Sequence, residues 1–411
     1  MLRNLSDRIS LMLKQFPIVA IIGARQVGKT TLAKYLEPEW RYIDMQMPSD
    51  QELVLNDPEF FFKNNPRNVI LDEAQIFPIL FDVLRGVIDN NRKENGRFII
   101  TGSSSPDLLK HLSESLAGRI AILELGTLKA NEIANLPQSS FYNWFKSPLS
   151  QIKQDISNLI TTDKINSRYI DQAWFDGGYP DIILSNGVDA KQNWFEFYEK
   201  TYLYRDIAVL FPKISQHNFQ RFVKMLAYLS GTIINKAELA RDLEISQGSI
   251  HNYLAICEGT FLWHSLPSFE HNKYKSIVKM PKGYISDSGL FHYLTRITNL
   301  DILKQHPLVG RSFEGFVIGE ILKGLQSQSI GSWQAYHYRT KHGAEIDLIL
   351  EGNFGILPIE IKYGIKIDKR QLTTLTNFIN GLELPLGLVI NQAERIEWLS
   401  PKILQLPVGY I

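Results

Sequence analysis

The sequence predicts an α/β protein with an N-terminal parallel sheet, a helical middle region and a second α/β region at the C-terminus. Residues 17–22 form a continuous apolar run of strand length, as expected for a parallel strand buried on both faces. Residues 217–268 have the pattern of short helices, and residues 344–362 alternate polar and apolar side chains at the period of a strand. Further strand and helix patterns alternate before residue 130, which indicates one parallel sheet with helical crossovers.

The composition is that of a globular protein with several domains. The chain has 411 residues, of which 44% are hydrophobic and 21% charged. No apolar run reaches the roughly 18 to 20 residues that span a bilayer. Residues 1–16 lack the apolar core and cleavage site of a secretory signal, so we expect a cytoplasmic protein without membrane contact.

Cysteine usage and net charge exclude two further classes of site. The single cysteine, Cys257, excludes an intramolecular disulfide and a multi-cysteine zinc site, and its apolar neighbours favour a buried thiol. The net charge of +1 gives no support for nucleic-acid binding by the chain as a whole. A nucleic-acid site must therefore be argued from local patterns.

The first apolar run leads directly into a phosphate-binding pattern. Residues 23–30, GARQVGKT, match G-x-x-x-x-G-K-[ST] without substitution, and a helical stretch follows at residues 31–36. Gly23 and Gly28 let the backbone turn its N–H groups toward phosphate oxygens. Lys29 neutralises the β- and γ-phosphates and the Thr30 hydroxyl ligates magnesium, so we expect ATP with Mg²⁺. The residues expected to bind the nucleotide are Gly23, Ala24, Arg25, Gln26, Val27, Gly28, Lys29, Thr30 and Thr31.

A second apolar strand, residues 68–71, ends in the acidic pair Asp72-Glu73. Carboxylates at the carboxyl end of a buried parallel strand lie at the sheet edge where phosphates bind. We expect Asp72 to hold magnesium, usually through a water, and Glu73 to orient and polarise the attacking water. An adjacent Asp-Glu pair is typical of the P-loop fold with an additional strand and a catalytic glutamate. The alternative is an acidic N-cap for a helix at residues 79–88.

The remaining strands of this sheet suggest two more catalytic residues. Residues 97–101 predict a strand that ends near Ser103, whose hydroxyl would lie beside the γ-phosphate and sense hydrolysis; serine-rich loops without this role are also common. Residues 41–45 predict a peripheral strand and residues 120–125 a fifth strand. Arg119 precedes the fifth strand and could reach a phosphate in cis or across a subunit interface. The alternative for Arg119 is an ordinary salt bridge.

The middle of the chain predicts a helix-turn-helix. Two short helices, residues 236–243 and 247–258, flank a short turn, with Asn235 as the N-cap of the first. The second helix exposes polar but not basic side chains, so a DNA-contacting module and a structural lid remain equally open. Residues 261–266 and 276–280 predict wing strands. The lysines that form the clearest basic stretch are Lys273, Lys275, Lys279 and Lys282.

The C-terminal region predicts an amphipathic helix, residues 313–322, followed by a hairpin. Its strands cover residues 344–350 and 357–362, and the turn between them is expected to centre on Asn353-Phe354.

This turn would place charged side chains of the two strands opposite each other. Asp347 then lies opposite Glu360, and Lys362 shares the face of Glu360. Two carboxylates that hold a metal ion and a lysine that positions the nucleophile are what a magnesium nuclease needs, and Glu314 could complete the cluster. The alternative is a hairpin with cross-strand charges on its solvent face.

Several ordered motifs support a resemblance that covers nearly the whole chain. They are residues 23–30, 71–75, 101–104, 116–119, 177–180, 282–290, 313–314, 345–347 and 359–362. Taken in order, these motifs resemble the prokaryotic AAA-type ATPases, loosely the archaeal-ATPase group, that carry an uncharacterised C-terminal domain. The resemblance implies an AAA-type core, a winged-helix region and a terminal domain similar to PD-(D/E)xK nucleases. The expected domains are residues 1–130 (ATPase), 131–215 (helical linker or lid), 216–300 (winged-helix-like) and 301–411 (nuclease-like).

Two functions follow from these patterns. The first is an ATP-hydrolysing enzyme whose nucleotide cycle is coupled to DNA binding or cleavage by the C-terminal domain. The second is a regulatory or signalling NTPase with an inactive nuclease-like domain used for binding. The expected partners are ATP, DNA, and a second copy of the chain or another protein.

Overall fold

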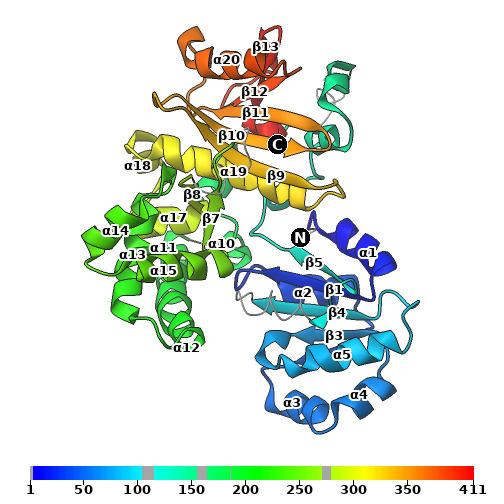
Figure 1. Cartoon of the computed structure of the whole chain (residues 1–411). Coiled ribbons are helices and arrows are strands. Elements are labelled where there is room, and N and C mark those ends of the chain that lie inside the picture. The colour runs from blue at the N-terminus through cyan, green and yellow to red at the C-terminus, as the bar shows by residue number, and fades with distance from the viewer. Residues whose placement is uncertain (1–2, 104–114, 155–163, 186, 271–278) are drawn as a thin grey trace. The chain divides into compact units, whose positions relative to one another are not determined.

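The computed structural model describes residues 3–103, 115–154, 164–185, 187–270 and 279–411 (Figure 1). The chain divides into two compact units. The N-terminal unit comprises Met1–Leu128, Ala255–Leu262 and Gln326–Gln328, and the C-terminal unit comprises Lys129–Leu254, Trp263–Leu325 and Ser329–Ile411. The divisions expected near residues 215 and 300 fall inside the C-terminal unit and stay predictions. No helix of the described residues is long and apolar enough to cross a membrane.

The N-terminal unit contains a parallel sheet of five strands in the order β2-β3-β4-β1-β5, as the sequence predicted. The strands are β1 (Ile18–Gly23), β2 (Arg41–Asp44), β3 (Val69–Asp72), β4 (Phe98–Ser103) and β5 (Ile120–Glu124). Every residue of β1 and β3 is buried, which explains their continuous apolar sequences. Strand β4 lies between β1 and β3, so the strands that lead into the phosphate-binding loop and the acidic pair are not neighbours.

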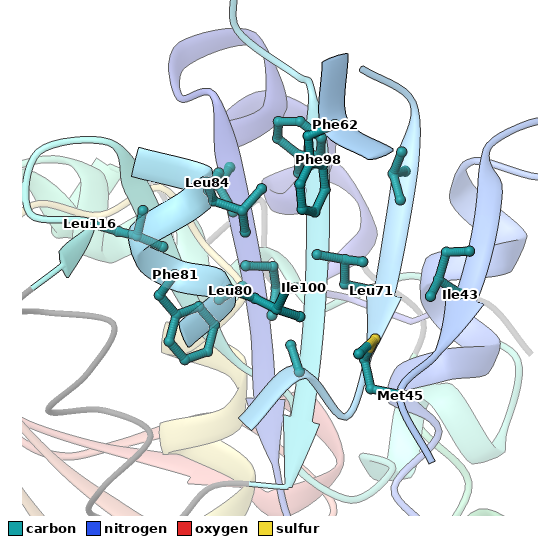
Figure 2. Close-up of a cluster of buried hydrophobic side chains, with 14 of the residues drawn as sticks. Ile43, Met45, Phe62, Leu71, Leu80, Phe81, Leu84, Phe98, Ile100 and Leu116 are labelled. Atoms are coloured by element: carbon teal, nitrogen blue, oxygen red, sulfur yellow. The ribbon is translucent and has the colours of Figure 1, made fainter. Parts of the chain in front are cut away.

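Helices pack against this sheet and fix the ends of its strands. They are α1 (Ser6–Gln15), α2 (Lys29–Leu36), α3 (Pro48–Leu55), α4 (Pro58–Asn64) and α5 (Ile79–Asp89), with a 3₁₀ turn η1 (Ala74–Ile76). Figure 2 shows the apolar core between the sheet and α3, α4, α5 and η1, in which Phe62 and Phe98 meet edge to face with ring centroids 5.7 Å apart. Such aromatic pairs contribute about 0.5–1.5 kcal/mol beyond the area they bury. The core therefore holds β3 and β4 firmly beneath their polar ends.

The C-terminal unit begins with short helices, in agreement with the predicted helical region. They are α7 (Ala130–Ile133), η2 (Ser140–Lys146), η3 (Leu149–Gln154), α9 (Ser167–Asp176), α10 (Pro180–Leu184), α11 (Val188–Tyr198) and α12 (Ile207–Leu210). A wider π-helical stretch, η4 (Glu199–Asp206), joins α11 to α12. Aromatic side chains of α11 and η4 pack together: Trp194 stacks on Tyr198 with centroids 5.0 Å apart, and Tyr198 contacts Tyr202 at 5.2 Å. Tyr198 and Tyr202 are buried, so this part of the aromatic segment belongs to the core.

Three helices and a small sheet follow. They are α13 (Gln216–Tyr228), α14 (Lys236–Leu243), α15 (Gln247–Gly259), β6 (Thr232–Ile233), β7 (Trp263–Leu266) and β8 (Lys282–Ile285), with sheet order β6-β8-β7. The Asn235 side chain caps α14 as predicted, since it accepts hydrogen bonds from the Ala237 and Glu238 N–H groups. The order of these elements is compatible with a winged helix.

Only the last two residues of the predicted second wing strand can be compared with the structure, and neither is in a strand. We expected it at residues 276–280, but β8 begins only at Lys282. Residues 276–278 lie outside the described residues, and residues 279 and 280 are not in a strand. Pro281 supplies the reason, because proline has no N–H to donate and is tolerated only at the margin of a strand.

The rest of the C-terminal unit is a mixed sheet with helices. The helices are α17 (Ser288–Leu294), α18 (Leu300–Gln305), α19 (Val309–Gln326), η5 (Lys369–Leu372), α20 (Thr373–Gly381) and η6 (Val408–Tyr410). The strands are β9 (Trp333–Arg339), β10 (Glu345–Gly352), β11 (Gly355–Ile361), β12 (Gly387–Asn391), β13 (Glu397–Ser400) and β14 (Ile403–Pro407), in the order β13-β14-β12-β11-β10-β9. Strands β10 and β11 pair antiparallel around Asn353-Phe354, which confirms the predicted turn. Helix α20 packs its apolar side on this sheet (Figure 1).

Candidate nucleotide site and a buried carboxylate–lysine cluster

The loop between β1 and α2 has the backbone conformation that its sequence requires. Gly23 has a φ of 154°, and a Cβ there would lie 2.2 Å from the Leu125 carbonyl oxygen, so only glycine fits. Gly28 caps α2 with a left-handed φ of 92°, and Gln26 has a positive φ of 62°. A non-glycine residue in this region is strained, and such strain is concentrated at functional sites.

Lys29 is buried at the start of α2, with 5% of its surface exposed. Its Nζ donates hydrogen bonds to the carbonyl oxygens of Gly23, at 3.1 Å, and Ala24, at 2.8 Å. Burial lowers the pKa of Lys29, while the charges of Glu73 and Asp72 oppose that shift. The loop thus places an amine that is poorly solvated by water between its own carbonyl groups and two carboxylates.

Asp72 accepts hydrogen bonds from three hydroxyl groups at the end of β3. Thr30 Oγ1 lies 2.9 Å from both carboxylate oxygens, Tyr42 OH lies 2.8 Å from Oδ2, and Thr101 Oγ1 also contacts Oδ1. Burial and the hydrogen bond to Asp72 raise the pKa of Tyr42 well above its usual range, so the phenol remains a donor. A hydroxyl and a carboxylate in contact are oxygen ligands of the kind that magnesium prefers, so Thr30 and Asp72 fit this ion.

Sequence reasoning missed Tyr42 and Thr101. Both are polar residues in strands that flank β3, and each reaches Asp72 only because β2 and β4 are its neighbours. The signal that could have found them is a hydroxyl near the carboxyl end of a strand next to the acidic pair.

Glu73 has a left-handed backbone, with φ 51° and ψ 41°, and its carboxylate accepts a hydrogen bond from the Gln75 side chain. The alternative role as an N-cap of the following helix is wrong, because α5 starts after Pro78 and that cap position has no side-chain hydrogen bond. Glu73 instead stands at the N-cap position of η1 without a side-chain capping hydrogen bond, and its strained backbone is of the kind that active sites retain.

Ser103 is the last residue of β4, and the strand register places its backbone beside that of Gly23. The Ser103 side chain lies outside the described part of the structure, so its role as a sensor stays a prediction.

Arg119 lies at the opposite edge of the sheet from the phosphate-binding loop. Its carbonyl accepts a hydrogen bond from Ile18 N–H at the start of β1, whereas the loop follows the end of that strand. At about 3.3 Å per residue the separation is roughly 17 Å. The guanidinium instead binds Asp89 in a bidentate manner, at 2.9 and 2.8 Å. The expectation that Arg119 acts on ATP in its own chain is therefore wrong.

The four residues of the predicted nuclease-like site come together in the C-terminal unit. The β10–β11 register, extended by one pair, places Asp347 opposite Glu360. Lys362 Nζ lies 2.6 Å from Glu360 Oε1, and Asp347 Oδ2 accepts a hydrogen bond from Ile361 N–H at 2.8 Å. Asp347 is 7% and Glu360 6% exposed, so the alternative of a charged hairpin face in solvent is wrong.

Lys282 joins this cluster from β8. Its Nζ lies 2.5 Å from Glu314 Oε1, 3.7 Å from Asp347 Oδ1 and 3.9 Å from Glu345 Oε2, and Tyr284 OH donates to the same Glu314 oxygen at 2.5 Å. We call these residues the carboxylate–lysine cluster: Glu314, Glu345, Asp347, Glu360, Lys282 and Lys362.

Lys282 does not belong to a basic surface, contrary to the sequence prediction, because only 5% of it is exposed. Lys279 pairs with Glu270, and Lys273 and Lys275 lie outside the described residues. The basic stretch therefore gives no support for nucleic-acid binding within the described structure.

Burial and the neighbouring charges shift the pKa values of several residues in the carboxylate–lysine cluster. Burial and the charge of Asp347 raise the pKa values of Glu314 and Glu360 well above the usual range for a carboxyl. Burial alone would lower the pKa of Lys282, but the charges of Glu314, Asp347 and Glu345 outweigh it, so the net pKa is raised. The Glu360 Oε2 atom is buried and has no hydrogen-bond partner in the described structure.

The residue types of the cluster suit a divalent cation, but their arrangement does not. Among the described residues, no group of three or more histidine, cysteine or carboxylate side chains is placed to hold a metal ion. Glu314 Oε1 is occupied by Lys282 and Tyr284, and Glu360 Oε1 by Lys362. The structure thus brings together the residues of the predicted nuclease site, Glu314, Asp347, Glu360 and Lys362. Their side chains are not arranged to bind a metal ion.

Three families match successive parts of the chain. Residues 15–134 match the family described as an AAA domain, residues 167–301 a domain of unknown function (DUF8612), and residues 309–410 a domain of unknown function (DUF4143). Together with the sheet order and the loop geometry, these matches define a P-loop NTPase of the AAA type with additional domains.

Two curated relatives match most of the chain. The "uncharacterized protein Rv2008c" of Mycobacterium tuberculosis is 32% identical over 352 residues, which cover 85% of this chain and 71% of the relative. The "uncharacterized protein Mb2031c" of Mycobacterium bovis matches to the same extent. The chain belongs to the same family as these mycobacterial proteins.

Two solved structures are more distant. A Walker-type ATPase of Pyrococcus abyssi, PABY2304, shares 15% identity and a TM-score of 0.41, over 71% of this chain and 94% of its own. A RuvB of Thermotoga maritima shares 15% identity and a TM-score of 0.31, over 67% of this chain and 94% of its own.

Proposed function

We propose that the N-terminal unit binds ATP with magnesium and hydrolyses it. The observation that carries this proposal is the contact between Thr30 Oγ1 and Asp72, at 2.9 Å, beside the buried Lys29. A phosphate-binding loop, a hydroxyl and a carboxylate at one sheet edge are the parts that phosphoryl transfer requires.

Each residue has a distinct role in this proposal. The backbone N–H groups of residues 23–31 surround the phosphates, and Lys29 leaves its carbonyl partners to contact the β- and γ-phosphates. Thr30 and Asp72 hold magnesium, which stabilises charge on the phosphates when bound. Glu73 accepts a proton from the attacking water and orients it. Ser103 contacts the γ-phosphate from the end of β4.

Steady-state phosphate release from Mg²⁺–ATP by the purified full chain tests this proposal. Wild type is compared with Lys29→Ala, which removes the phosphate contact, and with Glu73→Gln, which removes the base. Turnover that persists in both folded variants would contradict the assignment, because a contaminating ATPase would then explain the activity.

We further propose that the C-terminal unit acts as a binding module under control of the ATPase, which is the regulatory function predicted above. The observation that favours it over DNA cleavage is the pairing of the cluster carboxylates with Lys282 and Lys362, at 2.5 and 2.6 Å. Carboxylates already neutralised by lysines have little affinity left for a metal ion.

DNA cleavage is the competing function and is tested directly. Single- and double-stranded DNA are incubated with wild type in Mg²⁺ or Mn²⁺, with and without ATP. We expect no cleavage. Metal-dependent cleavage that is lost in Lys362→Ala would reject the binding-module proposal and establish an ATPase with nuclease activity, and Lys29→Ala would then show whether ATP controls it.

A further inference from the structure

Lys282 carries a buried ammonium to the carboxylates of Glu314, Asp347 and Glu345 in the carboxylate–lysine cluster. We propose that the Lys282 ammonium is the built-in cation of this site, and that Glu314, Asp347 and Glu345 bind a divalent cation only when Lys282 is absent or withdrawn. The proposal rests on the binding-module function of the C-terminal unit and is independent of ATP hydrolysis.

The distances place the ammonium among the carboxylates. Lys282 Nζ lies 2.5, 3.7 and 3.9 Å from oxygens of Glu314, Asp347 and Glu345, which come from α19 and β10. A divalent cation bound to the same carboxylates would need oxygens at about 2.0–2.6 Å. It would then lie within a few Å of the ammonium, where repulsion between like charges in a buried site is strong. One cation therefore excludes the other.

The surrounding backbone holds Lys282 in this position. Gly283 follows it in β8, and a Cβ there would lie 2.2 Å from the Trp263 ring. Gly315 follows Glu314 in α19, and a Cβ there would lie 3.1 Å from the Tyr284 ring. These two glycines permit β8 to approach both β7 and α19 closely. Lys282 is consequently buried, with 5% of its surface exposed.

The second lysine of the cluster differs in this respect. The Lys362 side chain is 32% exposed, whereas that of Lys282 is 6% exposed, so Lys362 can turn toward solvent. Its partner Glu360 also carries the buried Oε2 atom without a hydrogen-bond partner in the described structure. Removal of Lys282 would leave Glu314 and Asp347 without their ammonium and Glu360 with an available oxygen, all within one buried site.

The test measures Mn²⁺ binding, without nucleotide, to the full chain. Wild type is compared with Lys282→Met, which keeps the apolar stem, and with Lys282→Ala. Electron paramagnetic resonance counts bound Mn²⁺, and isothermal titration gives the affinity. We expect each Lys282 variant to gain one Mn²⁺ site that binds at least about tenfold more tightly than any in wild type. Lys279→Ala removes another paired lysine and should gain no site.

A second substitution locates the new site. Glu314→Gln combined with Lys282→Met should remove the gained Mn²⁺ binding, whereas a site formed elsewhere would persist. Folding is followed by the thermal midpoint, which Mn²⁺ should raise in the Lys282 variants and not in wild type. If a Lys282 variant is unfolded without metal, recovery of its native circular dichroism on addition of Mn²⁺ supports the proposal, and no recovery counts against it.

Two results would overturn the proposal. One is a folded Lys282→Met variant that binds Mn²⁺ no more tightly than wild type. The other is tight Mn²⁺ binding by wild type that Glu314→Gln abolishes, because Lys282 would then not exclude metal. DNA cleavage by the Mn²⁺-loaded variant has no bearing on the cation exchange itself; it would instead contradict the separate proposal that the module only binds.

Discussion

Thr30 and Asp72 are in hydrogen-bond contact although the strand before Thr30 and the strand that ends at Asp72 are not neighbours in the sheet. Thr30 Oγ1 lies 2.9 Å from both Asp72 oxygens, and β4 separates β1 from β3. The contact is achieved because α2 begins at the carboxyl edge of the sheet, over the end of β4. Two residues that come from separate sequence motifs therefore form one site.

Lys29→Ala should weaken ATP binding by about 100-fold or more, because hydrogen bonds to charged groups contribute about 1.5–3 kcal/mol each and Lys29 would contact two phosphates. Isothermal titration with Mg²⁺–ATP measures the Kd. Lys63→Ala, at an exposed position of α4, is the matched control and should bind normally. An affinity for ATP within a few-fold of wild type in folded Lys29→Ala would remove Lys29 from the site.

Glu73→Gln should bind ATP normally and lose about 10²- to 10⁴-fold in turnover, because the amide keeps the shape of the carboxylate but cannot accept a proton. Single-turnover hydrolysis and ATP titration of the same preparation separate chemistry from binding. Gln75→Ala, which removes the hydrogen-bond donor to Glu73, should have a smaller effect on turnover. Normal hydrolysis by Glu73→Gln would exclude Glu73 as the base.

Tyr42→Phe should raise the Mg²⁺ concentration needed for half-maximal turnover by about three- to tenfold. The Tyr42 hydroxyl donates to Asp72 Oδ2 at 2.8 Å, and its loss frees the carboxylate to turn away from the magnesium position. Tyr35→Phe is the control, since Tyr35 is 63% exposed. An unchanged Mg²⁺ dependence in Tyr42→Phe would show that Thr30 and Thr101 orient Asp72 without it.

The residues of the nucleotide site that lie in contiguous motifs could be predicted from the sequence. The residues that reach the site only through the tertiary fold could not. The loop at residues 23–30 and the pair Asp72-Glu73 each carry their function in adjacent residues, so the sequence shows them directly. Tyr42 and Thr101 reach Asp72 only through the order of the strands. Arg119 precedes β5, and β5 runs parallel to β1. It therefore lies at the amino end of these strands, whereas the phosphate-binding loop follows the carboxyl end of β1.

The carboxylate–lysine cluster also contains one contact that could be predicted from the sequence and one that could not. The short turn of the β10–β11 hairpin fixes its register, so the pairing of Asp347 with Glu360 could be predicted. Lys282 is 65 residues from Asp347, and only the tertiary fold brings β8 and β10 close enough for the two side chains to meet. Several lysines close together in a sequence indicate a basic surface. No feature of the neighbouring residues distinguishes Lys282, which is buried, from the other lysines of this stretch.

Stability should fall as the pH decreases from about 6.5 to about 4, in part because of His292. Its Nδ1 contacts the Phe175 carbonyl at 2.9 Å and its Nε2 contacts Ser312 Oγ at 2.6 Å. Burial lowers the pKa of His292 to about 4, below its ordinary value of 6.5. The unfolded chain therefore takes up a proton in this interval while the folded chain does not, so stability present above pH 6.5 is progressively lost.

Urea unfolding across this pH interval measures the effect. His292→Gln should be less stable than wild type at pH 7 but lose less of its free energy of unfolding on acidification. Because burial also lowers the pKa values of His264 and His337 to about 4, part of the pH dependence should remain. His251→Gln, at an exposed position of α15, should keep the wild-type dependence, and an equal flattening in both variants would contradict the role of His292.

Arg119→Ala should change ATP turnover by less than about twofold, because the guanidinium is paired with Asp89 at the edge of the sheet remote from the phosphates. Asp89→Ala is the matched variant, since it breaks the same pair and leaves the arginine in place. Turnover per chain is measured over a wide range of protein concentrations.

If both variants behave like wild type at every concentration, Arg119 is a structural residue. If only Arg119→Ala loses activity, and wild-type turnover per chain rises with concentration, Arg119 acts on ATP bound by a neighbouring copy. That second outcome would require the arginine to leave Asp89 on assembly, and Asp89→Ala should then match or exceed the wild-type rate.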